Sequence, residues 1–558
     1  MPTLHVSTLD AVIVAGYLVA AISLGFWFGR KKMETDDAFF LADREASWPL
    51  VGASLFCSNI STQQFVGQAG LAYAIGLAAG AFQMVGAVCF LLLATFFVDV
   101  YLGLRLKTSP EFYEHRYNRS CRTLVSALNI ALIVLASTTA SLYTGAIVLC
   151  ALFGWGTATQ FALAVAGIAV AAGAYTIFGG LRSVLWTDLF QAGMLVCGGA
   201  VTLVLGIRHA GGIPAVLATY SDSGGSMWSL FLSWDHPFGW LAMATGALIL
   251  GVHMHCTDHD FVQRALAARS VFDAKLGAIF AAFLKVVALF IVSAPGVVAA
   301  KLIPHLANPD RAYAQMVIRY IPSGFSGLVL ASLLAAILGS VSAGLTASSS
   351  LVVYDFILRA RPGISERNRV RLGRAVMLLI LLFCASLAPG IARFRGVYGY
   401  MVEIGSLLGP PVFVCAVAGI LTRRANARGA IATLAVGMGL GLAGFALLQS
   451  PVALADLPRY FRGALNLAFV DTVVCAGVMA LVSRLFPGTD RAASEIHRAR
   501  RSPALDRGQR TILTGVIVAL VVLWVAVVTT FSPLGLAAPR AATTADVAAA
   551  EPGPRGAR

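Results

Sequence analysis

Apolar residues in this chain form about 14 long runs separated by short polar segments. The runs cover roughly residues 9–28, 48–74, 77–103, 123–153, 157–178, 182–207, 236–257, 272–300, 322–357, 373–391, 398–421, 428–448, 464–485 and 512–531. A helix needs ~20 residues to cross the hydrocarbon core of a bilayer, and the longer runs predict tilted or broken helices. The pattern predicts an all-α polytopic membrane protein with about 14 transmembrane helices.

Composition agrees with a membrane protein and removes one alternative. Charged residues make up 12% of the chain, which is about half their share in a soluble domain. The net charge of +15 could indicate a nucleic-acid partner, but Lys and Arg lie in the short loops between apolar runs, where the positive-inside rule gathers them. We therefore expect the lipid bilayer as a partner and no nucleic acid.

The distribution of Lys and Arg also orients the chain. If the N-terminus lies outside, most of these residues fall in inner loops, and an even number of spans places the C-terminus outside as well. Segment 537–558 is rich in Ala, Pro and Gly and is expected to be a disordered tail. The preference for Ala, and for Arg over Lys, indicates a bacterial inner membrane.

Polar residues interrupt two of the apolar runs. One interruption is 58–64 (SNISTQQ), and the other is 251–258 (GVHMHCTD), five spans later. Interrupted helices at matching positions of two halves indicate a binding site near the bilayer midplane. The sequence contains no HExxH motif, P-loop or recognisable Ser/His/Asp cluster, so we expect a protein that is not an enzyme.

Several blocks of sequence are similar to those of a known family. They are ASLFCSNISTQQFVGQAG at 53–70, TSPEFYEHRYN at 108–118, AYTIFGGLRSVLWTDLFQA at 174–192, CTDHDFVQRALAARS at 256–270 and, more weakly, ASLLAAILGSVSAGLTASSSLVVYDF at 331–356. In order and spacing the chain resembles the sodium/solute symporter family, which includes the sodium/glucose cotransporters, up to about residue 450.

The resemblance implies a LeuT-like core of two inverted five-helix repeats. The domains expected are an extra N-terminal helix with the first inner loop at 1–47, the first repeat at 48–207, the second repeat at 208–421, three additional helices at 422–536 and the tail at 537–558. It further implies sodium-coupled symport of a small polar solute by alternating access. A monomer or a weak homodimer is expected.

The resemblance also implies a sodium site between the first and eighth core helices. It places backbone carbonyl ligands at Cys57, Ile60 and Ala336. Of the two hydroxyl positions, Ser340 keeps its hydroxyl, but Gly339 has none, so Ser342 or a water molecule is a candidate substitute. The alternative is that these serines are small residues for close helix packing.

Asp188 is the further candidate for contact with sodium. A carboxylate at membrane depth is costly and usually faces a cavity or a cation. The resemblance implies that Asp188 guides sodium exit or joins a second sodium site. The alternative is an interfacial carboxylate paired with Arg182.

The expected substrate site is lined by Asn59, Gln63, Gln64, Gln83, His253 and Lys285. Asn59, Gln64 and Lys285 match positions in sugar-transporting relatives, whereas Gln83 stands where those relatives have a glutamate. For His253 and His255, lining the cavity, binding a metal and packing through hydrogen bonds all stay open. A pairing of Glu403 with Lys285 is a further hypothesis.

Two classes of function remain open. We expect symport of a sugar or a sugar-like polyhydroxy compound, with a small carboxylate or another organic solute as the alternative. A membrane sensor that binds its substrate without accumulating it belongs to a different class. Saturable binding without sodium-dependent accumulation would distinguish such a sensor from a symporter.

Overall fold

The computed structural model describes residues 7–29, 34–61, 63–221, 225–393, 397–450, 456–487, 494–496, 498–499 and 505–537. Nearly all of the expected tail, 538–558, lies outside these residues. The described residues contain no β-strand and only isolated bridges between strand-like residues. The regular structure of the described residues is therefore all-helical, as the apolar pattern predicts.

The helices follow one another with short connections; η marks a 3-10 or π-helical segment. The first part forms α1 (Thr8–Gly29), α2 (Asp36–Leu41), η1 (Ala42–Arg44), α3 (Trp48–Asn59), η2 (Gln63–Gln68), α4 (Ala69–Ile75), η3 (Gly76–Gly80), α5 (Ala81–Leu92), η4 (Leu93–Phe97), α6 (Val98–Gly103), α7 (Glu111–Arg116), α8 (Arg119–Ala131), η5 (Leu132–Thr138), α9 (Thr139–Phe153), α10 (Ala158–His209) and α11 (Ile213–Leu217).

The second part of the chain is equally helical. It forms α12 (Trp240–Ala242), η6 (Met243–Ala247), α13 (Leu248–Val252), η7 (His253–Thr257), α14 (His259–Leu266), α15 (Val271–Ala288), η8 (Leu289–Ser293), α16 (Ala294–Leu302), η9 (Pro309–Arg311), α17 (Ala312–Tyr320), α18 (Phe325–Leu351), η10 (Val352–Ile357), α19 (Leu358–Ala360), α20 (Glu366–Leu387), η11 (Ala388–Arg393), α21 (Val397–Leu408), α22 (Pro410–Leu421), α23 (Ala427–Leu448), η12 (Arg459–Arg462), α25 (Ala464–Leu485) and α27 (Arg507–Thr530).

The number of spans differs from the expectation. Within the described residues, 11 helices are long and apolar enough to cross a membrane, or up to 12 if one bent pair counts as a span. The expected count of about 14 is thus not confirmed. One reason is α10, which joins the predicted spans 157–178 and 182–207 into one 52-residue helix bent at Gly180. Another is α3, whose 12 residues span only ~18 Å.

The bend in α10 depends on glycine. Gly180 has φ +56°, and a Cβ there would lie 2.5 Å from the Phe39 carbonyl oxygen. An L-residue with a side chain pays both a conformational and a steric penalty in that position. Glycine therefore lets α2, which contains Phe39, pack directly against the bend.

Both of the polar interruptions in the sequence become breaks in the helices. The α3 helix ends at Asn59, and Ile60 leaves helical geometry with ψ 88° before the π-helical η2 begins. The π-helical η7 ends at Thr257, and Asp258 after it is extended with ψ 132°. Such breaks are tolerated at membrane depth only where protein or a water-lined cavity surrounds them. Asn59 and His255, beside the two breaks, are both buried.

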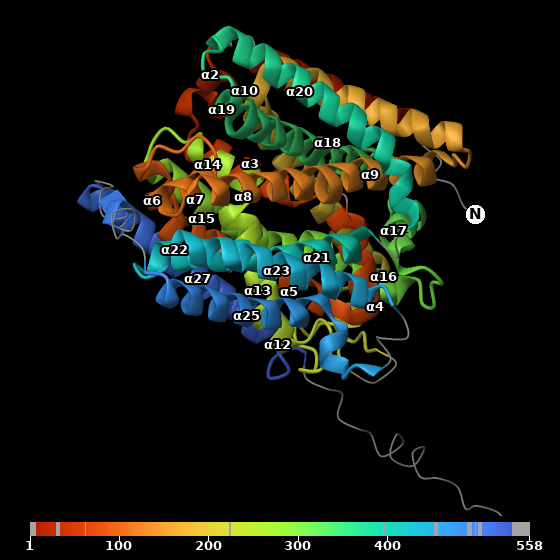
Figure 1. Ribbon diagram of the computed structural model, residues 1–558. Coiled ribbons are helices and arrows are strands. Elements are labelled where there is room, and N and C mark those ends of the chain that lie inside the picture. The colour runs from red at the N-terminus through yellow and green to blue at the C-terminus, as the bar shows by residue number, and fades with distance from the viewer. Residues whose placement is uncertain are drawn as a thin grey trace, which may run out of the picture.

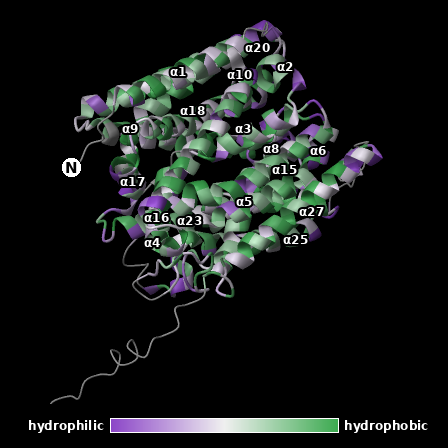
Figure 2. Ribbon diagram, turned by 180° about the vertical axis from the view of Figure 1, so that it is seen from behind, coloured by the Kyte–Doolittle hydropathy of each residue, from purple (hydrophilic) through white to green (hydrophobic). Residues whose placement is uncertain are grey.

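Some helices lie at the buried centre of the bundle, and others expose apolar side chains on its outside. Figure 1 shows the long helices running side by side. Every residue of α18 from Val329 to Leu351 is buried, and α18 packs against α10, α1 and α3. By contrast, α1, α20 and α27 expose many large apolar side chains, and the hydrophilic residues gather near the ends of the helices (Figure 2). The exterior matches a lipid environment.

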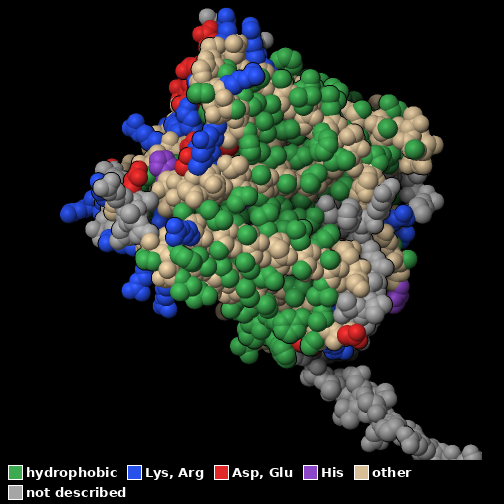
Figure 3. Space-filling view, viewed as in Figure 1, with side chains coloured by type: hydrophobic (Ala, Val, Ile, Leu, Met, Phe, Trp, Pro, Cys, Tyr) green, Lys and Arg blue, Asp and Glu red, His purple; other side chains and the backbone are tan. Residues whose placement is uncertain are grey.

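One end of the helix bundle is basic. Figure 3 shows Lys and Arg side chains gathered at the end where α2, α6 and α7 lie, beyond a hydrophobic middle zone. At this end Asp36 pairs with Lys107 at 3.3 Å and with Arg369 at 3.0 Å. Burial by itself would raise the pKa of Asp36, but the two cations outweigh it and hold the pKa below its usual value of 3.8.

Candidate functional site

A polar cavity lies where the two broken helices meet. Its volume is about 70 Å³, and the polar residues that line it are Asn59, Gln64, Gln83, His255 and Lys285. The rest of its lining is apolar and includes Phe82, Val85, Leu250, Met254, Met401 and Val402. The cavity thus combines a few convergent polar groups with an apolar wall, as small-molecule sites commonly do.

Lys285 on α15 is the cation of this cavity. It is only 2% exposed, and its Nζ donates to Asn59 Oδ1 and, at 2.8 Å, to Gln83 Oε1. No carboxylate is among the described residues that line the cavity. The structure does not pair Lys285 with Glu403, whose Oε2 instead accepts from Gln449 Nε2 at 3.3 Å. The buried charge is therefore compensated by amide dipoles.

The amides around Lys285 form one ordered chain of hydrogen bonds. Gln83 Nε2 donates to Gln68 Oε1 at 2.6 Å and to Gln64 Oε1 at 3.2 Å. Gln64 Nε2 in turn donates to Asn59 Oδ1 at 3.3 Å. Because each amide offers both donors and acceptors, the chain can exchange internal bonds for bonds to a hydroxyl-rich solute. Gln68 was not anticipated from the sequence, although it lies four residues after Gln64 and hence on the same helical face.

The two histidines next to the second break have different surroundings. His255 lines the cavity, where its Nε2 lies 3.3 Å from Asn59 Nδ2 and its Nδ1 lies 2.7 Å from the Gly251 carbonyl oxygen. Since a carbonyl only accepts, Nδ1 carries the proton and Nε2 accepts from Asn59. His253, the residue expected in the site, contacts Thr257 Oγ1 at 3.0 Å instead. The structure thus brings His255, and not His253, to the cavity.

The remaining expected substrate residue is Gln63. Its backbone belongs to η2, but its side chain lies outside the part of the chain that is described. Asn59, Gln64, Gln83 and Lys285 are brought together as the sequence suggested.

The expected sodium ligands lie where α3, α10 and α18 meet. Ser61 N donates to the Asn59 carbonyl and Gln64 N to the Ser61 carbonyl, so neither bonds the Cys57 or Ile60 carbonyl as a continuing helix would. On α18, Ser340 Oγ donates to the Ala336 carbonyl at 2.9 Å. The break therefore leaves α3 suited to offer carbonyl oxygens to a hard cation.

Ser342 was a candidate to replace the hydroxyl that is missing at Gly339, but its side chain points elsewhere. Its Oγ donates to the Gly339 carbonyl at 2.9 Å, within α18. A Cβ on Gly339, by contrast, would lie 3.6 Å from the Cys57 Cβ and 3.7 Å from Asp188 Oδ1. Gly339 itself therefore faces the expected site.

Asp188 is fully buried beside this site. Its Oδ2 accepts from Ser54 Oγ at 2.5 Å, and its Oδ1 accepts no hydrogen bond from the described residues. Arg182, the alternative partner, instead pairs with Glu45 at 2.8 Å. A buried carboxylate oxygen without a donor fits a cation ligand. The sequence did not single out Ser54, because serine occurs repeatedly in block 53–70 and nothing distinguishes this one.

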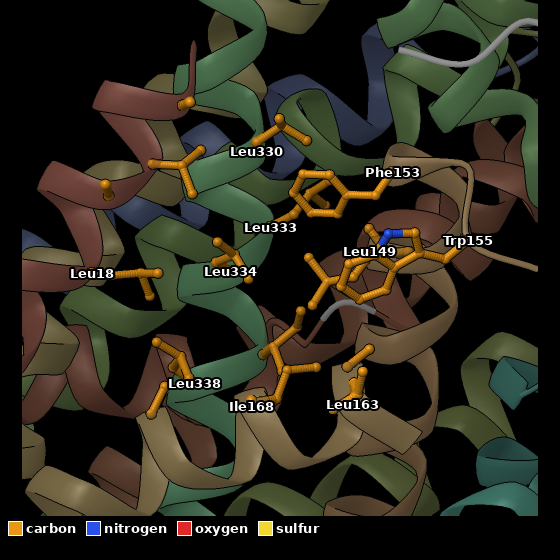
Figure 4. Close-up of a pocket in the computed structure, with 18 residues that line it drawn as sticks. Leu18, Leu149, Phe153, Trp155, Leu163, Ile168, Leu330, Leu333, Leu334 and Leu338 are labelled. Atoms are coloured by element: carbon orange, nitrogen blue, oxygen red, sulfur yellow. The ribbon is translucent and has the colours of Figure 1, made fainter. Parts of the chain in front are cut away.

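A second, larger cavity of about 390 Å³ lies between α1, α9, α10 and α18. Figure 4 shows its lining, which includes Leu18, Leu149, Phe153, Ile168 and Leu334. Leucine, isoleucine and phenylalanine offer no hydrogen bonds to a polar solute. The smaller cavity around Lys285 is thus the better candidate for the solute site.

Broken helices that hold buried polar side chains at the centre of an apolar bundle are typical of secondary transporters. Residues 39–437 match the Sodium:solute symporter family, and the chain belongs to this family. The resemblance stated from the sequence is confirmed, and sodium is the coupling ion of the family. The protein is an integral membrane protein, and both its family and its fold are those of a transporter.

Individual relatives agree with this assignment. The chain is 29% identical over 454 residues to a sodium/glucose cotransporter of Vibrio parahaemolyticus, covering 76% of this chain and 83% of the relative. It is 30% identical to sodium/myo-inositol cotransporter 2 of Sus scrofa, covering 78% of this chain and 69% of the relative. A Na+-coupled sialic acid symporter, solved in a substrate-bound outward-open state, shares its fold with a TM-score of 0.71 at 18% identity, over 87% of this chain and 99% of that one.

Proposed function

We propose that this protein carries a neutral polyhydroxy solute, a sugar or a sugar-like compound, together with sodium. The observation that supports this most directly is the amide chain of Asn59, Gln64 and Gln83 against an apolar wall. Amides pair with hydroxyls as donor and as acceptor, and apolar side chains cover the C–H faces of a polyol. The relatives that transport glucose and myo-inositol by name carry solutes of this type.

A small carboxylate is the second candidate. Its support is Lys285, whose positive charge faces no carboxylate among the described lining residues. Against it, Lys285 already donates to two amide oxygens. No arginine is among the described residues that line the cavity, so none is there to bind a carboxylate through bidentate hydrogen bonds. We therefore place the neutral solute first.

Transport requires the cavity to change its size. Its volume of about 70 Å³ is well below the ~300 Å³ at the lower end of ligand sites. The solute therefore enters when the helices that line the cavity move apart, and alternating access supplies that movement. The breaks beside Asn59 and Asp258 are the positions where α3 and α13–η7 can move relative to their continuations.

The end of α3 couples the two sites. Asn59, a solute residue, lies between Cys57 and Ile60, whose carbonyls are the expected sodium ligands. Sodium that fixes this turn also fixes the Asn59 side chain, so sodium raises the affinity for solute, and by linkage solute raises the affinity for sodium equally. The membrane potential contributes ~2.3 kcal/mol per charge per 100 mV to uptake.

We further propose that 48–207 and 208–421 are the two inverted repeats, that 1–47 and 422–536 add one and three helices, and that the basic end faces the cytoplasm with both termini outside. The matching breaks after Asn59 and before Asp258 support the repeats, and the gathered Lys and Arg side chains support the orientation. A bacterial inner membrane and a monomer or weak homodimer complete the proposal.

Uptake into proteoliposomes tests the function. The expected result is that labelled glucose or myo-inositol accumulates against its gradient when sodium is imposed outside, and not when choline replaces sodium. Competition by unlabelled carboxylates instead of polyols would favour the second candidate. Saturable binding of a solute without accumulation in either buffer would refute symport and favour a sensor.

A further inference from the structure

Two oxygen atoms from α10 converge on the position where the expected sodium site lacks a hydroxyl. A Cβ on Gly339 would lie 3.0 Å from Gln191 Oε1 and 3.7 Å from Asp188 Oδ1. Both side chains are 0% exposed. The space that a side chain at 339 would enter is thus bordered by an amide oxygen and a carboxylate oxygen.

Neither oxygen receives a hydrogen bond from the described residues. Leaving a buried acceptor without a donor is costly, and two such acceptors facing one point are costlier still. The Tyr175 hydroxyl, which also lies against Gln191, donates to the Leu338 carbonyl at 3.3 Å. A cation between the two oxygens would satisfy both.

Neighbouring groups fix which atom of each side chain faces this point. Gln191 Nε2 donates to the Tyr17 hydroxyl at 3.4 Å, which turns Oε1 toward Gly339. The Tyr17 ring stacks on Phe190, with centroids 5.8 Å apart. Ser54 Oγ holds the other oxygen of Asp188. Because Tyr17 belongs to α1, the helix before the expected core takes part in orienting the site.

We propose that Gln191 Oε1 is a ligand of the coupling sodium, beside Asp188, and takes the place of the hydroxyl absent at Gly339. Sodium is a hard cation that prefers carboxylate and carbonyl-type oxygens, and an amide oxygen belongs to that class. Glycine at 339 leaves the room that the longer glutamine side chain fills from the facing helix. This inference rests on the proposed sodium coupling.

Sodium binding to the purified full-length protein tests the assignment without transport. Sodium chloride replaces choline chloride at constant ionic strength, with no solute present, and the melting temperature gives the sodium concentration of half-maximal stabilisation. Gln191→Met removes the oxygen but keeps the length of the side chain. We expect it to raise that concentration about tenfold or more. Thr176→Val is the matched control, because Thr176 is buried on the same helix and bonds to the Ala172 carbonyl.

Three further variants keep the test decisive if Gln191→Met does not fold. Gln191→Glu retains an oxygen and adds a charge, so it should bind sodium at least as tightly as the wild type. Gln191→Ala should bind weakly, and adding Gly339→Ser should restore part of the affinity by returning a hydroxyl to the site. Failure of this restoration, together with a weaker-binding Gln191→Glu, would overturn the assignment.

The outcomes separate this assignment from the proposed coupling. A wild type that responds to sodium and a Gln191→Met variant with the same half-maximal concentration would refute only the role of Gln191. A wild type with equal melting temperatures in sodium and choline would refute the sodium coupling and the assignment together. A response that shifts in Gln191→Met but not in Thr176→Val supports both.

Discussion

Replacing Asn59 by alanine is the most informative perturbation of the solute cavity. The Asn59 side chain joins three others: its Oδ1 accepts from Lys285 and Gln64, and its Nδ2 donates to His255. Asn59→Ala removes these bonds at once and leaves the buried Lys285 and His255, and the half-buried Gln64, with fewer partners. The hydrogen bond to the Lys285 ammonium is the strongest of them because it is assisted by charge.

The expected magnitude follows from the three bonds. The two bonds between neutral groups contribute ~1 kcal/mol each and the bond to Lys285 contributes ~2 kcal/mol, giving ~4 kcal/mol in all. Hydrogen bonds inside membranes average nearer ~0.6 kcal/mol, because the unfolded state also finds partners there. We therefore expect Asn59→Ala to lower the free energy of unfolding by about 2–4 kcal/mol.

A double-mutant cycle isolates the charge. In Asn59→Ala, the costliest consequence is that the buried Lys285 ammonium loses a hydrogen-bond acceptor. Lys285→Met removes that ammonium, so the cost is absent from the double variant. We expect a coupling energy of about 1–2 kcal/mol between the two substitutions, measured by reversible unfolding in mixed micelles. Additive effects, or a loss below ~0.5 kcal/mol for Asn59→Ala, would show that the Lys285–Asn59 bond does not support the cavity.

Three other predictions follow from single sites. Gln64→Ala should weaken solute binding more than sodium binding, and Ser340→Ala should do the reverse, in equilibrium titrations of each ligand; the opposite pattern would exchange the two site assignments. Gly180→Ala should lower stability by ~1–3 kcal/mol or more because of the positive φ and the Phe39 carbonyl, whereas Gly167→Ala, with open space at its Cβ, should not. The pKa of Asp36 is held below 3.8, so its contribution to stability is present above pH 3.8 and disappears as the pH falls through the lowered value. The free energy of unfolding should therefore differ between wild type and Asp36→Asn above that pH. A difference that persists at lower pH would contradict this.

Local features of the sequence account for the helical architecture and the family. Apolar runs determine which segments can lie in a bilayer, because each residue contributes its own transfer free energy regardless of distant neighbours. The polar stretches 58–64 and 251–258 likewise locate the breaks beside Asn59 and Asp258. The count of spans is less local, since joining two runs through Gly180 depends on helix α2, whose Phe39 packs against it.

The tertiary structure alone decides which polar atoms meet. His253 and His255 differ by two positions, and the rotation of the helix between them sends only His255 to the cavity. Gln191 and Gly339 lie on different helices, α10 and α18, and no spacing in the sequence indicates that an amide oxygen on one fills the space left by a glycine on the other. Side-chain contacts of this kind depend on how helices cross and rotate, which is a property of the whole packing, whereas membrane insertion and helix breaks depend on the residues of one segment.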